Sequence, residues 1–234
     1  MQTKRLIVFI VLLALLIPAS VQAKSPESHS CSLPESNSEA LEILSNYYPG
    51  YWWDHTNLTI AVQAHPSATQ AQLNAINNAI AAWSSVLDDC FNGAITLTNV
   101  TGQSKNKLRD VDIILHYGQN AGGVSFAGYA ICGNHKCNNI MVTSDAPPSP
   151  NSQPYDPYYI GWITQHEIGH ALGLGHSTNL WESTDLMGYG WTETIDHVLS
   201  DCDIDALHFV FAWVFDGSIA PHKPAEGPYD CSLD

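Results

Sequence analysis

Basic residues are scarce in this chain of 234 residues: Lys and Arg together number 8, against 23 Asp and Glu. Two of them, Lys4 and Arg5, lie at the extreme N-terminus, and without this pair six basic residues face 23 acidic ones, a balance of −17. Such a surface repels nucleic acid and anionic membranes, so we expect neither as a partner. Calcium binding is one use for the acidic residues, although solubility accounts for most of them.

Long apolar runs are also lacking, apart from one that begins at Leu6 and ends at Ile17. It follows the basic pair and precedes Val21-Gln22-Ala23, a small-x-small sequence. This combination is typical of a secretory signal peptide, residues 1–23, and it predicts cleavage near Ala23 and a secreted, extracellular protein. The run is short for a bilayer span, so an uncleaved anchor is the lesser alternative and we expect no stable membrane insertion.

Paired Cys-x-x-Cys spacings, which are typical of cysteine zinc sites, are absent. The even number of cysteines in a chain predicted to be exported indicates three disulfides instead. Cys132 and Cys137 are close enough in the sequence to close a small loop. The other four allow three pairings, of which we expect Cys90–Cys202, with Cys31–Cys231 joining the two tails. The six candidates are Cys31, Cys90, Cys132, Cys137, Cys202 and Cys231.

Apolar periodicity divides the middle of the chain into strands and helices. The predicted helices are Ser67–Leu87 with Ser67 as N-cap, Tyr159–Leu172, and Asp201–Trp213 with Ser200 as N-cap. The predicted strands are Leu58–Gln63, Ile95–Val100, Val111–His116, Phe126–Ile131 at an edge, and Asn139–Thr143. Five prolines between Asp145 and Pro157 predict a loop. We expect one domain over residues 51–213, between a polar segment at 24–50 and a Pro- and Gly-rich tail at 214–234.

The stretch from His166 to His176, HEIGHALGLGH, carries the chemistry. His166 and His170 are four residues apart, so they lie on one face of a helix and can hold one zinc ion. Gly173 can take a left-handed conformation and end the helix, so that His176 returns to the metal. Three protein ligands leave a position for water, which predicts a catalytic zinc with Glu167 beside it. A helix with solvated histidines would leave the glycine and the third histidine unexplained.

The extended pattern H-E-x-x-H-x-x-G-x-x-H is the motif of metzincin metalloproteases, and the chain resembles their matrixin branch. Ser177 directly follows the third histidine, as in matrixins. The segment Leu199–Leu207 resembles the start of the matrixin C-terminal helix, and Trp53 ahead of Asn57–Ile60 resembles the approach to the first strand. The resemblance implies an α+β catalytic domain: a twisted, mostly parallel five-stranded sheet with an antiparallel edge strand, a zinc helix, a Met-turn and a C-terminal helix.

The resemblance also implies residues around the zinc. Met187 would form a soft, apolar floor beneath the three imidazoles. Tyr189 lies two residues after this methionine, where the astacin and serralysin branches have a tyrosine that approaches the zinc. It could be a fifth ligand, a hydrogen-bond donor to the oxyanion, or a ring packed against the final helix near Leu207.

A second metal is a further expectation from the family, which often holds calcium or a structural zinc near its third to fifth strands. Four candidate ligands lie in that region, although the family's ligand spacing is not recognisable among them. They are Asp112, His116, His135 and Asp145.

The function implied is that of a secreted zinc endopeptidase, a monomer in which Glu167 is the general base for a zinc-bound water. A peptide or protein substrate would lie extended along the edge strand near Gly128–Ile131, and the pocket beside the zinc would be walled by about residues 190–198. The alternative is a catalytically weak or inactive module of the same fold, used for binding or adhesion. The intact glutamate and three histidines argue against that alternative.

Substituting Tyr189→Phe separates the readings of this tyrosine, because it removes the hydroxyl and keeps the ring. If the hydroxyl stabilises the oxyanion, turnover of a peptide should fall about 100-fold, since one such donor contributes roughly 2.7–4 kcal/mol. The melting temperature should not change. Unchanged turnover would indicate that the ring has a packing role.

Overall fold

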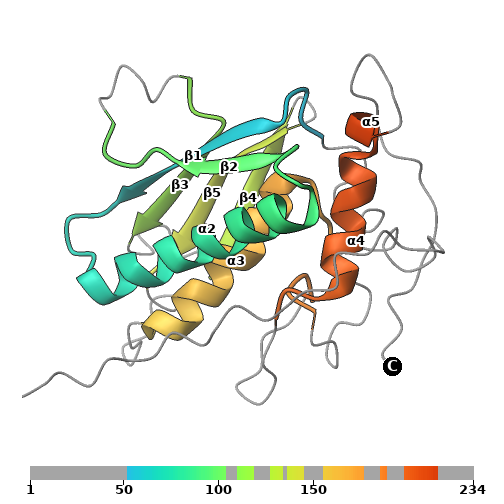
Figure 1. Ribbon diagram of the computed structural model, residues 1–234. Helices are drawn as coiled ribbons and strands as arrows, with labels where there is room; N and C mark the ends of the chain where they lie inside the picture. Colours follow the sequence, from blue (N-terminus) through green and yellow to red (C-terminus); the bar gives the residue numbers. More distant parts are fainter. Residues whose placement is uncertain are drawn as a thin grey trace, which may run out of the picture.

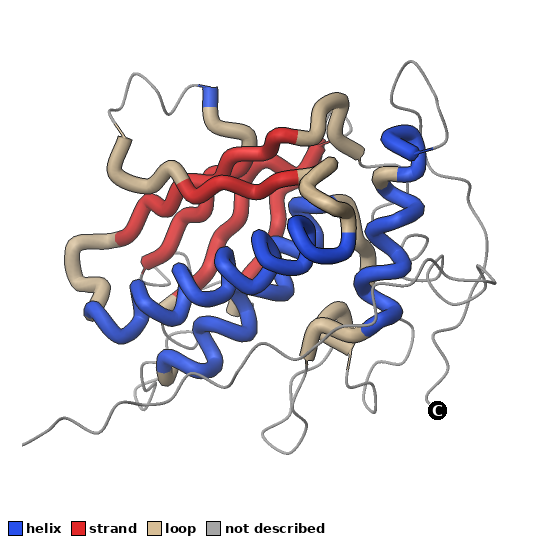
Figure 2. Tube along the Cα trace, viewed as in Figure 1, coloured by secondary structure: helices blue, strands red, loops and turns tan. Residues whose placement is uncertain are grey.

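The computed structural model describes residues 52–103, 110–118, 127–133, 136–144, 155–176, 185–188 and 198–215. In this part of the chain two long helices, α2 and α3, lie on one face of a five-stranded sheet, and a third, α4, stands beside them (Figures 1 and 2). None of the described helices is long and apolar enough to cross a membrane. The predicted leader, polar segment and tail lie outside the described residues, except for the tail's first two positions, 214 and 215.

The sheet has the order β2-β1-β3-β5-β4, with every neighbouring pair parallel except β4 and β5. The predicted fold class, a mostly parallel five-stranded sheet with an antiparallel edge strand, is therefore confirmed. Each strand overlaps its predicted range, and the ends differ by a few residues. The strands are β1 (Asn57–Ala64), β2 (Thr96–Asn99), β3 (Ile113–Gly118), β4 (Gly128–Gly133) and β5 (Lys136–Thr143).

Alternation along the central strand shows which face of the sheet is covered. In β3, Ile113, Leu115 and Tyr117 are buried, while the residues between them are only half-buried. The covering helix α2 (Gln70–Cys90) presents a buried stripe that includes Ile80 and Trp83. The core therefore lies between the sheet and the two long helices. Helix α3, which carries His166 and His170, packs on this core.

The N-cap of helix α2 lies two residues later than predicted. Its N-cap is Thr69, whose hydroxyl accepts from the N–H of Gln72, while the Gln72 side chain accepts from the N–H of Thr69. The hydroxyl oxygen of Ser67, the predicted N-cap, instead lies 2.7 Å from Nδ1 of His65. Both residues have a glutamine three positions on, Gln70 after Ser67 and Gln72 after Thr69, so the sequence offers two capping boxes. In the structure Gln72 completes the box with Thr69, while the side-chain amide of Gln70 donates to Oδ1 of Asn74.

Helix α3 (Pro157–Leu172) begins two residues earlier than predicted, inside the stretch expected to be a loop. Proline is tolerated at the first helical position, and Asp156 caps the helix by accepting from the N–H of Tyr159 at 2.8 Å. The helix ends at Leu172 because Gly173 takes a φ of 112°, the left-handed conformation that the sequence predicts there.

The last predicted helix is divided in two at Phe211. Helix α4 (Asp201–Val210) has Ser200 as its N-cap, as predicted, and the short α5 (Ala212–Phe215) follows it. Phe91, directly after α2, stacks on His208 of α4 with ring centroids 4.3 Å apart. This contact joins the far end of α4 to the core.

The predicted loop-closing disulfide is present. Cys132 and Cys137 lie opposite each other in the β4–β5 hairpin and are bonded. The disulfide fastens the outermost strand to its only neighbour among the described strands.

The expected Cys90–Cys202 bond is wrong. Both residues are disulfide-bonded, but the bond between two described cysteines is Cys132–Cys137. The remaining candidates, Cys31 and Cys231, lie outside the described residues.

The capping box gives a first stability prediction. Thr69→Ala should lower the free energy of unfolding by about 0.5–2 kcal/mol, because it removes the acceptor for an N–H in the first turn. Ser67→Ala is the matched control and should change it by less than about 0.5 kcal/mol, as an exposed position outside the helix. Chemical denaturation of both variants measures the difference, and equal losses would contradict Thr69 as the N-cap.

Candidate metal centre

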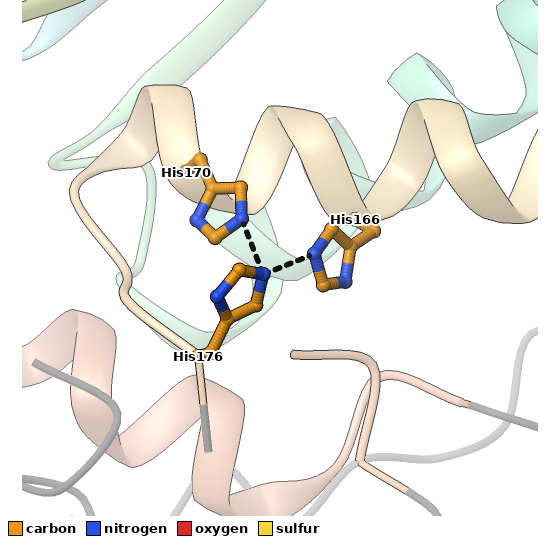
Figure 3. Close-up of side chains that lie close together, drawn as sticks. All are labelled: His166, His170 and His176. Atoms are coloured by element: carbon orange, nitrogen blue, oxygen red, sulfur yellow. Dashed lines mark hydrogen bonds between the residues drawn. The ribbon is translucent and has the colours of Figure 1, made fainter. Parts of the chain in front are cut away.

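Three imidazoles converge at the end of α3 (Figure 3). Nε2 of His176 lies 3.1 Å from Nε2 of His166 and 3.1 Å from Nε2 of His170. Within the described ranges, these three residues form the one group of His, Cys, Asp or Glu whose ligand atoms lie close enough to share a metal ion. The spacing of the motif therefore does bring the three predicted ligands together.

The protonation state of the first two imidazoles follows from their other nitrogen. Nδ1 of His166 lies 2.7 Å from the carbonyl oxygen of Leu186, and Nδ1 of His170 lies 2.9 Å from that of Leu174. A carbonyl oxygen can only accept a hydrogen bond, so each Nδ1 carries the proton. Each Nε2 is then left with a lone pair directed at the common centre, as metal ligation requires.

The donor set fits zinc. Tetrahedral zinc with Zn–N bonds of about 2.0–2.1 Å places neighbouring nitrogens about 3.3 Å apart, close to the 3.1 Å separations here. Burial lowers the pKa of His170 well below its ordinary value, with the other two histidines adding to the effect. Burial, followed by the charge on His166, lowers the pKa of His176 to about 3. Neutral imidazoles are the form that binds a metal.

Glu167 is a buried carboxyl group beside the first ligand. The residue is 5% exposed, and its Oε2 has no hydrogen-bond partner among the residues that the structure describes. Desolvation raises the pKa of Glu167 to about 8, because removing the carboxylate from water favours the neutral form. A cation in the neighbouring site would act in the opposite direction.

Met187 lies beneath the histidine-bearing helix in a tight turn, in which the N–H of Gly188 donates to the carbonyl of Asp185 at 3.0 Å. It is fully buried, and a Cβ built on Gly169 of α3 would collide with its sulfur. The glycine inside the histidine motif therefore makes room for the methionine. The place predicted for Met187 beneath the three imidazoles, and its role as a floor to the metal, stay predictions.

Asp203 is a residue of the site that the sequence did not single out. It is fully buried on α4, and its carboxylate accepts from the backbone N–H groups of Leu186, Met187 and Ser200 at 3.1, 3.4 and 2.9 Å. Burial and then the charge of Asp185 raise the pKa of Asp203 to about 7, while these hydrogen bonds oppose the rise. The only sequence signal for this role of Asp203 was an acidic residue three positions after a serine N-cap, and such residues are common in helices that lie outside any site.

Of the ligands predicted for a second metal, the two that the structure describes, Asp112 and His116, contact other side chains. The carboxylate of Asp112 accepts from the N–H and hydroxyl of Thr59 at 2.8 and 2.7 Å and lies 3.0 Å from Nε2 of His55. Nε2 of His116 lies 3.3 Å from Oδ1 of Asn139. Neither residue belongs to a metal-binding group in the described part of the chain.

Several predicted features fall where the structure is not described. They are Tyr189, His135, Asp145 and the predicted pocket wall up to residue 197. Their roles stay predictions.

Comparison with known proteins gives one family match. The family model for matrixin matches residues 51–212, and no curated protein matches the chain. Similar solved structures include high choriolytic enzyme 1, a hatching enzyme zinc-protease from Oryzias latipes, at 18% identity over 54% of this chain and 50% of that one, with a TM-score of 0.32. Another is metalloproteinase-II from Bacteroides fragilis, at 16% identity over 71% and 56%, with a TM-score of 0.44.

A third is archaemetzincin from Archaeoglobus fulgidus, at 16% identity over 64% of this chain and 92% of that one, with a TM-score of 0.31. The chain thus spans about half the length of the first two structures. At these TM-scores the structures add nothing to the family match.

The position of Asp203 leads to a test of the metal centre. Asp203→Ala should leave the buried N–H groups of Leu186 and Met187 without their acceptor, at a cost of about 1–3 kcal/mol each. Because the Leu186 carbonyl accepts from His166, zinc affinity should fall about 10–100-fold, as for other residues that orient a ligand. Zinc competition titrations measure it, with Asp201→Ala, an exposed residue in the same helical turn, as the control. Equal affinities in the two variants would contradict the role.

Proposed function

The chain belongs to the matrixin family, and from that premise we propose that it is a secreted zinc endopeptidase in which Glu167 is the general base. The observation that carries the proposal is the arrangement of four groups. Three neutral imidazole nitrogens face one point, and a buried carboxyl group with an unpaired oxygen lies next to them in the sequence. This is the minimum that metal-assisted hydrolysis of an amide needs.

His166, His170 and His176 would hold the zinc ion, which when bound supplies a Lewis acid for the scissile carbonyl and lowers the pKa of water towards neutrality. Glu167 accepts the proton of the attacking water and delivers it to the nitrogen of the departing amine. The burial that raises its pKa suits the second step, because a carboxyl group that holds its proton can act as the acid. The carbonyls of Leu186 and Leu174 keep two of the imidazoles in orientation.

The antiparallel edge strand supports an extended peptide as the substrate. β4 pairs with β5 alone among the described strands, so its other edge offers backbone N–H and C=O groups to an added strand. The side chain of Ile131 is 47% exposed on this strand. At Gly128 the same strand passes directly over Glu167, so a peptide bound there would run past the metal centre.

The predicted leader and the disulfide-bonded cysteines support the proposal that the protein is secreted. Residues 1–23 have the composition of a secretory signal peptide. Cys90, Cys132, Cys137 and Cys202 are all disulfide-bonded, and such bonds persist in oxidising compartments.

Two substitutions test the proposal by separating proton transfer from metal binding. Glu167→Gln should retain zinc and the melting temperature but lose about 10²–10⁴-fold in turnover, because an amide cannot accept the proton. His176→Ala should lose zinc as well as activity. Metal analysis and cleavage of a peptide library measure both. Near-normal turnover in Glu167→Gln would mean that another group is the base, and a wild-type protein that holds zinc yet cleaves no peptide would favour the inactive binding module.

A further inference from the structure

Gly128, the first residue of β4, lies unusually close to helix α3. A Cβ built on its backbone would lie 2.5 Å from Cγ2 of Ile163, 2.8 Å from Oε1 of Glu167 and 2.9 Å from Cγ of Glu167. Real Cβ atoms do not approach other atoms so closely. Gly128 is not among the described glycines with positive φ, so its backbone alone would accept alanine. The strand therefore needs glycine at this position because of what lies beneath it.

The side chain of Glu167 lies beneath Gly128 and is held there by packing. Within the described part of the chain, Oε2 of Glu167 has no hydrogen-bond partner, so no donor there fixes the rotation of the carboxyl group. The last torsion of a glutamate is intrinsically broad. Ile163 lies one turn earlier on the same face of α3, and the backbone of Gly128 covers the group from the strand side. These two surfaces form a clamp on the Glu167 side chain.

We propose that Gly128 is a positioning residue for the hydrolysis: its missing side chain lets the edge strand hold the carboxyl group of Glu167 in place by direct contact. This inference rests on the proposed function. A general base must lie within about 2.6–3.2 Å of the proton that it accepts. A methyl group at position 128 would have to displace the carboxyl group, and a displacement of about 1 Å can cost about 100-fold in rate.

The same strand offers a matched control. Gly133 is the last residue of β4, it also lacks a positive φ, and no atom of the described residues lies within 4 Å of a Cβ built on it. It lies outside the part of the strand proposed to bind substrate. Gly128→Ala and Gly133→Ala thus make the same chemical change on one strand, and only the first meets Glu167.

The first measurement compares kcat, KM, zinc content and melting temperature in the two variants. We expect Gly128→Ala to lower kcat about 100-fold, while KM and zinc content match those of Gly133→Ala. Peptide cleavage by the wild type and by Gly133→Ala tests the proposed function separately from the role of Gly128. Wild-type kcat in Gly128→Ala would overturn the inference.

A binding measurement distinguishes positioning from substrate docking. The dissociation constant of an uncleaved peptide should be the same in Glu167→Gln and in the double variant Gly128→Ala/Glu167→Gln, because the docking edge is intact. Weaker binding in the double variant would assign the loss to the strand's contact with substrate and would overturn the inference.

A double-mutant cycle with Ile163 tests whether the effect passes through the glutamate. Ile163→Ala removes the atom nearest to the new methyl group and leaves the contact with Glu167. We expect Gly128→Ala to lower kcat about as much in the Ile163→Ala background as in the wild type, each variant compared with its own parent. Full recovery of kcat in that background would mean that the methyl group acts by separating strand from helix, and it would overturn the inference.

Discussion

The hydrogen bond from Nδ1 of His166 to the carbonyl oxygen of Leu186 joins helix α3, which carries the first ligand, to the turn that contains Met187. On one side it fixes the tautomer of a ligand on α3, and on the other it ends in the turn that carries Met187. The N–H of Leu186 in turn donates to Asp203 on α4. A single residue, Leu186, thus connects α3 to α4, so the geometry at the metal depends on the packing of a helix that lies far from the ligands in the sequence.

The metal centre buries ionisable side chains, and this burial lowers the free energy of unfolding of the metal-free protein. Glu167, His170 and Asp203 are all at least 95% buried, and each has a pKa shifted towards its neutral form, mainly by desolvation. A divalent cation would oppose the shift at Glu167 and share the lone pairs of the imidazoles. The protein without metal therefore carries unfavourable terms that metal binding relieves, which is why metal affinity and folding stability should be coupled.

The ligand set was predictable because it is local: a spacing of four on one helix, a glycine to end it and a histidine just beyond. The mostly parallel sheet with one antiparallel edge strand was also predictable, through the family resemblance. Asp203 and Gly128 were not, because their roles arise from contacts between segments that meet only in the folded chain. The N-cap at Thr69 could not be decided from the sequence, since Ser67 and Thr69 each have a glutamine three residues on, Gln70 and Gln72. The disulfide partner of Cys90 was not predictable either, since it depends on which distant segments meet in the folded chain.

The register of the hairpin decides what lies over Glu167. Gly128 pairs with Val142, and further along the strand Cys132 pairs with Cys137 across a register shift between Ile131 and Cys132. A slip of one residue would turn every side chain of β4 to the opposite face and place Ala127 or Tyr129 where Gly128 now lies. Either would bring a Cβ against the glutamate. The Cys132–Cys137 bond opposes such a slip, because these two residues can be bonded only when they lie opposite each other. A disulfide at one end of the hairpin thus maintains a glycine over the proposed base at the other.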